Sequence, residues 1–201
     1  LQDACHKAGK DCKINPGDGA FYGPKLDFHI KDSLGRVWQC GTIQLDANLP
    51  ERFDLVYTDS DGSKKRPVML HRVIFGSVER FIGILIEHFA GAFPTWLSPV
   101  QVKVIPITDK QADYAQKIKE TLQQQNIRVE LDDKAETMQN KIRNAAGEKI
   151  PYMIIVGGRE EENNTISVRQ RDGQDLGNMS LNDFINQIKD QITKKALNLI
   201  K

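Results

Sequence analysis

The strongest constraint on the fold of this chain is the alternation of two apolar patterns between residues 102 and 192. Short apolar segments predict strands at 102–108, 127–131, 151–157 and 165–170. Other apolar residues recur at helical spacing: Ala112, Ala115, Ile118 and Leu122, then Met138, Ile142 and Ala145, then Leu181, Phe184, Ile185, Ile188 and Ile192. Asp109 and Ser180 can cap the first and last of these helices. The resulting βαβαββα order predicts a mixed, mostly parallel sheet with helices on its faces.

The first half of the chain has a pattern typical of an antiparallel sheet. Alternating residues predict strands at 26–32 and 37–46 around a turn at 33–35, with further strands at 53–59 and 65–75. A helix follows, since Val78, Phe81, Ile82, Leu85, Ile86 and Phe89 form one apolar stripe. Two prolines within 93–101 indicate an interdomain linker. We therefore expect an α+β domain at 1–98 and an α/β domain at 99–201.

Composition narrows the class of protein without naming it. The formal net charge is only +1, so charge alone does not indicate a nucleic-acid binder. No apolar run is long enough for a membrane helix, and we expect no membrane partner. Three cysteines, Cys5, Cys12 and Cys40, favour a reducing, cytoplasmic compartment over a disulfide scaffold. The chain begins at Leu1 within a helical pattern, and we interpret it as a fragment of a longer protein.

Polar residues in the strand at 37–46 form the first candidate site. Thr42 and Gln44 share one face by strand alternation, and Gln39 joins them only if Gly41 marks a bulge. They either make core hydrogen bonds or hold a polar small molecule. Lys25, at the rim of a loop with aromatic residues, is either a solvated surface lysine or part of the same site.

Arg80 is a second candidate, because a cation in the first turn of a helix opposes the helix dipole. It either pairs with Glu79 or Glu87 at the surface or helps the helix N-terminus to bind an anionic ligand. In the second half, Arg169 and Arg171 share strand parity and Arg143 lies on the preceding helix. These arginines belong either to a solvated charged face or to an RNA-binding surface.

Four segments in this order carry a family resemblance: FYGPK, WQCGTIQLD, PVMLHRVIFGSVERFIGILIEHFAGAFPTWLSPVQ and PYMIIVG. They closely resemble the corresponding stretches of threonyl-tRNA synthetases, and the similarity runs from about Gly17 to the last helix. The resemblance implies the end of a class II synthetase catalytic domain, a remnant of its antiparallel sheet, followed by an anticodon-binding domain. It implies ATP-dependent attachment of threonine to its tRNA through an adenylate.

The resemblance also implies roles for residues of the first half. Arg80 and Lys25 match catalytic positions; residues matching ATP-binding positions are Arg80, Ser77, Gln39 and Thr42. Tyr22 and Gln44 match positions near bound threonine, and His71 matches one ligand of a zinc ion that grips the threonine amine and hydroxyl. The implied cofactors are therefore ATP, Mg²⁺ and, in the full-length enzyme, Zn²⁺.

In the second half, the positions that match anticodon contacts are Arg143, Lys149, Glu160 and Arg169. Lys149 stands where the family has an arginine, and Ala135 where it has an asparagine, so part of the base readout is open. The implied partners are threonine tRNA, threonine and ATP, with a homodimer when the protein is full length.

Other family parts lie upstream of Leu1: two class II motifs, the remaining zinc ligands and the editing domain. We therefore expect the 201-residue chain alone to form no threonyl-adenylate and to hold no stoichiometric zinc. Cys5, His6 and Cys12 match no zinc-binding segment of the family. The rival hypotheses are a non-catalytic paralogue that binds tRNA or regulates, and another class II synthetase of the same subgroup.

Overall fold

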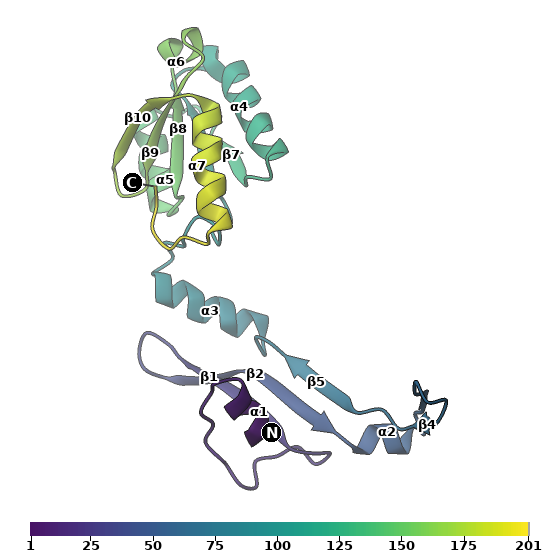
Figure 1. The fold of residues 1–201 in the computed structure, drawn as a ribbon. Helices are drawn as coiled ribbons and strands as arrows, with labels where there is room; N and C mark the ends of the chain where they lie inside the picture. Colours follow the sequence, from purple (N-terminus) through teal and green to yellow (C-terminus); the bar gives the residue numbers. More distant parts are fainter. Residues whose placement is uncertain (201) are drawn as a thin grey trace. The chain divides into compact units, whose positions relative to one another are not determined.

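The computed structural model describes residues 1–200, which form two compact units that divide between His88 and Phe89 (Figure 1). No helix among these residues is long and apolar enough to cross a bilayer. Each unit has its own sheet, as the two sequence patterns predict.

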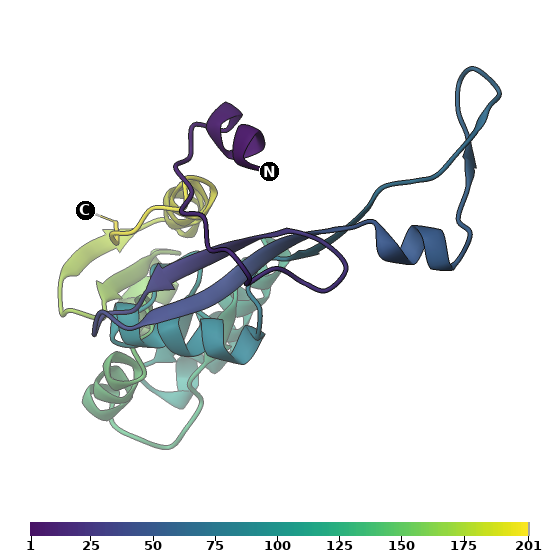
Figure 2. The same cartoon turned by 90° about the horizontal axis from the view of Figure 1, so that it is seen from below.

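The first unit is built on a three-stranded antiparallel sheet in the order β1-β2-β5. The strands are β1 (Lys25–Lys31), β2 (Val37–Asp46) and β5 (Met69–Val73). Helix α1 (Gln2–Lys7) precedes the sheet, α2 (Asn48–Arg52) follows β2, and α3 (Val78–Phe89) follows β5. A small hairpin of β3 (Tyr57–Thr58) and β4 (Lys64–Lys65) extends beyond the ends of β2 and β5 (Figure 2).

The strands predicted at 53–59 and 65–75 are much shorter than the sequence pattern suggested. Asp54 adopts a positive φ of 48°, which is not an extended conformation, so the predicted strand cannot run continuously from 53 to 59. Pro67 has no N–H to donate to a ladder and separates β4 from β5. Helix α2, which has five residues, was not predicted. It follows β2 directly: Asp46 is the last residue of that strand, and its Oδ1 accepts from the N–H groups of Asn48 and Leu49.

Strand β2 contains a bulge next to Gly41, which was the condition for Gln39 to share a face with Thr42 and Gln44. Phe28 pairs with Gly41, whereas the next residue, His29, pairs with Gln39. Cys40 is therefore the extra residue, and the side chains on either side of it change parity.

The second unit holds a five-stranded mixed sheet in the order β10-β9-β8-β6-β7. Its strands are β6 (Val102–Pro106), β7 (Val129–Leu131), β8 (Tyr152–Val156), β9 (Ile166–Gln170) and β10 (Asp175–Met179). Strand β6 runs parallel to both β7 and β8, and β9 runs antiparallel to its neighbours β8 and β10. All strands except β9 therefore share one direction, which confirms the predicted mixed, mostly parallel sheet.

Helices cover the two faces of this sheet unequally. Helices α4 (Ala112–Gln124) and α7 (Leu181–Thr193) pack on one face, over the larger core cluster. Helix α5 (Met138–Gly147) packs on the other face, over a small cluster of Ile105, Ala145, Ile150 and Met153. The sheet therefore has one face that is closed by two helices and one that α5 covers in part.

One local prediction in this unit needs correction, and two of its elements were not predicted. A 3-10 turn at Asp109–Gln111 precedes α4, so Asp109 does not cap that helix. The sequence pattern missed α6 (Gly158–Glu162) and β10, because α6 is short and polar and β10 has a glycine and polar residues at its open edge. Ser180, in contrast, caps α7 as predicted, with Oγ accepting from the Asp183 N–H at 3.1 Å.

Candidate functional site

The side chains singled out in the strands of the first half lie on one face of the β1-β2-β5 sheet. Directly paired residues of antiparallel strands point to the same side, and Gln44 pairs with both Lys25 and His71. Asp27 pairs with Thr42 on the same side. We call this surface the polar face; its residues are Lys25, Asp27, Gln39, Thr42, Gln44, Asp46 and His71.

Gln39 belongs to the polar face because of the bulge at Cys40. Its side chain Nε2 donates to Asp27 Oδ1 at 2.7 Å, across the pair of strands. Without the extra residue, Gln39 would have the opposite parity to Thr42 and would point to the other side of the sheet.

The loop before β1 places Tyr22 over the polar face. The Tyr22 hydroxyl donates to Gln44 Oε1, and its ring lies 5.4 Å from the His71 ring, centroid to centroid. The loop is held against β2 by backbone hydrogen bonds from Leu45 N to Pro24 O at 3.0 Å and from Ala47 N to Tyr22 O at 3.4 Å.

Lys25 lies between two carboxylates. Its ammonium is 2.8 Å from Asp27 Oδ2 and 3.7 Å from Asp18 Oδ1, and its side chain is 18% exposed. The hydrogen bond to Asp27 raises the pKa of Lys25, with a smaller opposing effect of burial. Lys25 is therefore a cation at neutral pH, suited to holding an anionic group and not to accepting a proton.

His71 is oriented by Asp46, a carboxylate whose side chain is fully buried. His71 Nε2 lies 2.8 Å from Asp46 Oδ2, and Asp46 Oδ1 accepts from the N–H groups of Asn48 and Leu49. Burial alone would raise the pKa of Asp46, but these hydrogen bonds lower it. The ionised carboxylate accepts a hydrogen bond from Nε2–H, and in the neutral tautomer that this bond favours, the other ring nitrogen, Nδ1, carries the free lone pair.

Arg80 and Ser77 lie at the start of α3. Ser77 Oγ accepts from the Arg80 N–H at 3.3 Å, which makes Ser77 a cap of this helix. The Arg80 guanidinium lies 5.6 Å from the Trp38 ring centroid, and Nη1 donates to the Gln39 carbonyl at 3.4 Å. Its charge is thereby brought to the strand that carries Gln39.

The two carboxylates expected as surface partners of Arg80 are bonded elsewhere. Glu87 accepts from Arg36 Nη2 at 3.0 Å, and Glu79 accepts from Ser77 Oγ at 2.8 Å. The guanidinium of Arg80 is exposed and lies over the Trp38 ring.

Sequence reasoning missed two carboxylates of the polar face, Asp27 and Asp46. The alternation within 26–32 does place Asp27 on the same side as Lys25, so parity was a usable signal for it. Asp46 had a weaker signal, as a charged residue ending an apolar strand. The role of Trp38 as a platform for Arg80 had no signal in the sequence, because their contact joins residues far apart in the chain.

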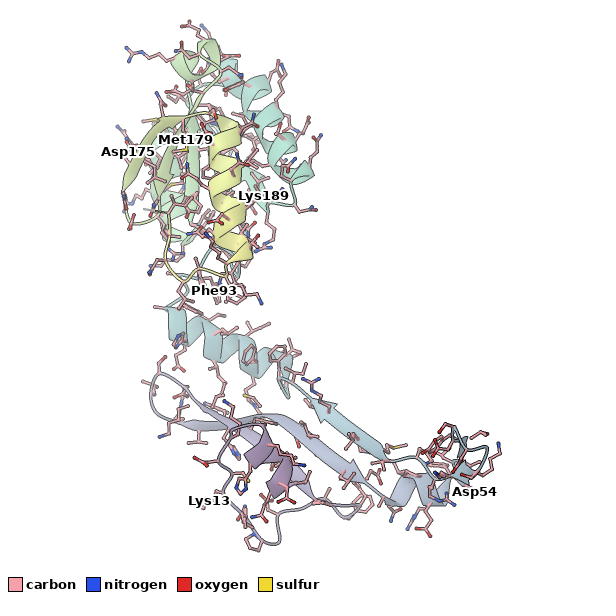
Figure 3. The ribbon with its side chains drawn as sticks, viewed as in Figure 1. Lys13, Asp54, Phe93, Asp175, Met179 and Lys189 are labelled. Atoms are coloured by element: carbon pink, nitrogen blue, oxygen red, sulfur yellow. The ribbon has the colours of Figure 1, made fainter. Side chains whose placement is uncertain are left out.

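In the second unit, Arg169 lies on the sheet face that α5 covers in part. It pairs across the sheet with Met153 of β8 and Asp175 of β10, and Figure 3 shows Asp175 at this edge. Arg169 Nη2 is 3.3 Å from Asp175 Oδ2, and its Nε is a buried donor without a partner among residues 1–200. Arg143 is exposed on α5, which packs on the same face of the sheet.

Lys149 and Glu160 are placed less simply. Lys149 is exposed with a positive φ of 61°, just after α5. Glu160 Oε2 accepts from the Gly157 N–H at 2.9 Å and so caps α6. Ala135 is exposed in the loop between β7 and α5. Glu160 thus has a structural function that any ligand contact would have to share.

Arg171 follows the last residue of β9, Gln170. Its guanidinium donates to the carbonyl oxygens of Phe93, Ala92 and Lys149 at 2.6, 2.9 and 3.2 Å. Arg171 thus has a structural function that any RNA contact would have to share.

No group of three or more His, Cys, Asp or Glu residues among residues 1–200 is arranged to hold a metal ion.

Two family models match the chain, one for each unit. A model described as the "tRNA synthetase class II core domain (G, H, P, S and T)" matches residues 5–89, and one described as "Anticodon binding domain" matches residues 101–191.

Curated relatives match almost the whole chain. Threonine–tRNA ligase of Acetivibrio thermocellus is 59% identical over 195 residues, which is 97% of this chain and 31% of the relative. Threonine–tRNA ligase of Caldanaerobacter subterraneus is 60% identical over 197 residues, which is 98% of this chain and again 31% of the relative. The chain thus spans about a third of the length of these proteins.

Two solved structures are also similar to this chain over most of its length. The "RNA binding domain of Threonyl-tRNA synthetase" from Cryptosporidium parvum has a TM-score of 0.85 at 40% identity, covering 94% of this chain and 48% of that one. A "putative threonyl-tRNA synthetase" from Aeropyrum pernix has a TM-score of 0.65 at 26% identity, covering 99% of this chain and 49% of that one.

Proposed function

This chain belongs to the threonine–tRNA ligase family, and from that premise we propose that its protein attaches threonine to threonine tRNA at the expense of ATP. Identity of about 60% along nearly the whole chain is the observation that carries this proposal. Because the chain spans 31% of these relatives, the activity is assigned to the protein that contains it.

In this proposal the polar face and the start of α3 contribute to the site where ATP and threonine react. Arg80 holds the ATP phosphates with Mg²⁺. In this structure its guanidinium lies over Trp38, which pairs with Ile30 and points away from the polar face, so the side chain must turn toward the polar face to reach ATP. Ser77, Gln39 and Thr42 line the ATP site. Tyr22 and Gln44, joined by a hydrogen bond, contact threonine, and Lys25 supplies a fixed positive charge near the reacting groups.

The zinc of the proposed site would be held on this chain by His71. Its geometry suits a ligand: the neutral ring donates a hydrogen bond from Nε2–H to Asp46 and keeps a free lone pair on Nδ1, an arrangement common behind metal-bound histidines. When bound, zinc supplies a Lewis acid that distinguishes threonine from its isostere valine through the hydroxyl group.

Within the second unit, we assign binding of the anticodon of threonine tRNA to a functional domain at 99–201. Anticodon bases are single-stranded and can spread over the partly covered sheet face beside α5. Arg169 and Arg143 are the main contacts with these bases, and Lys149 and Glu160 lie at the margin of the surface that binds them. We further propose a cytoplasmic homodimer for the full-length protein.

Threonine-dependent pyrophosphate exchange by the full-length gene product tests the catalytic half of the proposal. Arg80→Ala should reduce kcat by about 100-fold or more, as loss of one charge-stabilising donor does in other enzymes. Arg72→Ala is a matched control, because Arg72 pairs with Ile43 and points away from the polar face. Absence of threonine-dependent exchange by the wild type would instead favour a non-catalytic tRNA-binding paralogue.

Binding of cognate and anticodon-swapped tRNA to the 201-residue chain tests the recognition half. If Arg169 reads a base, Arg169→Ala should cost about 1–3 kcal/mol and reduce discrimination between the two tRNAs. If Arg169 contacts phosphate, Arg169→Ala should lower the affinity for both tRNAs alike. The slope of log affinity against log salt concentration should then fall in magnitude by about one unit. Lys117→Ala, on the exposed side of α4, is the control. Unchanged binding in Arg143→Ala and Arg169→Ala would place the tRNA surface elsewhere.

A further inference from the structure

Asp27 bonds through its side chain to two residues to which the proposed function gives substrates. Its Oδ2 lies 2.8 Å from Lys25 Nζ and its Oδ1 accepts from Gln39 Nε2 at 2.7 Å. A third such residue, Thr42, is its direct cross-strand partner and helps to lower its pKa. Nothing in the sequence pattern or the family comparison gives Asp27 a role of its own.

The position of Asp27 argues for an indirect role. Its side chain is 12% exposed, against 60% for Asp18, the other carboxylate near Lys25. A carboxylate is also a poor direct neighbour for ATP phosphates, because like charges repel. Asp27 is therefore placed to bond to its neighbours on the polar face and not to a nucleotide.

The geometry around Asp27 depends on long-range contacts. Lys25 lies two residues away on β1, Thr42 is its direct partner on β2, and Gln39 reaches it only through the bulge at Cys40. Lys and Gln side chains have many rotamers, and ordering them before substrates bind lowers the entropy lost on binding. One carboxylate orders both and lies directly across from Thr42.

Charge supports the same role. Burial alone would raise the pKa of Asp27, but the bonds from Lys25 and Thr42 lower it, and Asp27 in turn raises the pKa of Lys25. The pair is thus an ionised carboxylate and a protonated amine whose position is set before any ligand arrives.

We propose that Asp27 is a positioning residue of the synthetase site, which holds Lys25, Gln39 and Thr42 in the arrangement that binds ATP and threonine. This inference rests on the proposed function. It adds to that function a residue which acts on the substrates through its neighbours.

Asp27→Asn separates positioning from bulk. Asparagine has the same shape and keeps one oxygen that can accept a hydrogen bond from Gln39. Its amide NH₂, however, cannot accept a hydrogen bond from the Lys25 ammonium. In pyrophosphate exchange by the full-length gene product, we expect kcat/KM to fall about tenfold to a hundredfold. Asp18→Asn, which removes the exposed second carboxylate, should change kcat/KM by less than about threefold.

A double-mutant cycle with Lys25→Ala tests whether Asp27 acts through Lys25. If it does, Asp27→Asn should have less than about a threefold effect once Lys25 is absent. A merely structural role would give the same loss in both backgrounds, and that result would overturn the proposal. So would wild-type kcat/KM in Asp27→Asn.

Asp27→Glu covers the case in which Asp27→Asn does not fold. It keeps the negative charge for Lys25 and should retain more kcat/KM than Asp27→Asn or, if that variant is unfolded, than Asp27→Ala. A greater loss in Asp27→Glu would show that shape and not charge matters, and would overturn the proposal. Failure of the proposed function is separate, since it would appear as absent exchange in the wild-type protein.

Discussion

Asp32 shows how a single carboxylate can organise its surroundings at the residue scale. Its side chain is fully buried and accepts from the backbone N–H groups of Leu34 and Arg36, from Arg36 Nε at 2.5 Å and from Trp38 Nε1 at 2.7 Å. Burial would raise its pKa, but these hydrogen bonds lower it to about 2. Asp32 thereby fixes both the β1–β2 turn and the ring on which Arg80 stacks.

Asp32→Asn should destabilise the chain in a pH-dependent way. The folded pKa, about 2, lies below the ordinary value of 3.8, so the carboxylate stabilises the fold fully above the ordinary value. That contribution is lost as pH falls from about 4 to about 2. Urea unfolding followed by tryptophan fluorescence at several pH values measures it. The free-energy difference between wild type and variant should be constant near neutral pH and shrink below about pH 4. A pH-independent difference would contradict this account.

At the element scale, the loop before β1 is shaped by its contact with β2. A Cβ on Gly23 would lie 2.0 Å from the Leu45 carbonyl oxygen, much closer than atoms can approach. The absence of a side chain therefore lets the loop lie on the strand. This contact brings Tyr22 within reach of Gln44.

Gly23→Ala should push the loop off β2 and break the Tyr22–Gln44 bond. We expect a loss of about 1–3 kcal/mol in the free energy of unfolding, typical of overpacking, measured by urea unfolding. In the full-length protein, KM for threonine should rise. Gly19→Ala is the matched control in the same loop, because its Cβ would meet only the Gly23 carbonyl at an ordinary 3.5 Å. Equal stability of the two variants would argue against this contact.

At the scale of the whole molecule, the second unit includes residues that look like linker in the sequence. The segment from Phe89 to Gln101 is bonded to the α/β sheet and its loops. Arg171 donates to Ala92 and Phe93, and Arg128 donates to the carbonyl oxygens of Trp96 and Ser98. This segment is therefore part of the folded unit.

A fragment of residues 89–201 should unfold cooperatively on its own. A fragment of residues 102–201 should melt lower by about 5 °C or more, because Arg171 and Arg128 lose buried carbonyl partners. Arg171→Met within 89–201 should reproduce part of that loss, whereas Lys117→Met should not. Differential scanning calorimetry measures all four proteins. Equal melting temperatures for the two fragments would mean that the segment only links.

The sequence by itself determined the elements whose residues are neighbours in the chain. Helical stripes gave α3, α4, α5 and α7, and alternation gave the main strands and the shared side of Thr42 and Gln44, because 3.6- and 2-residue periods are local properties. The same parity, with the bulge allowed for, could place Gln39. Family resemblance alone singled out Tyr22 and His71, whereas Arg80 was also marked by its place in the first turn of a helix.

Only the tertiary structure decided which groups meet. The convergence of Lys25, Gln39 and Thr42 on Asp27, and the stack of Arg80 on Trp38, depend on strand register and on contacts between distant residues. Arg171 is an example, because its guanidinium bonds to carbonyl groups almost 80 residues away in the chain. A local pattern carries no information about such partners, because the free energy of a buried hydrogen bond depends on groups that folding brings together.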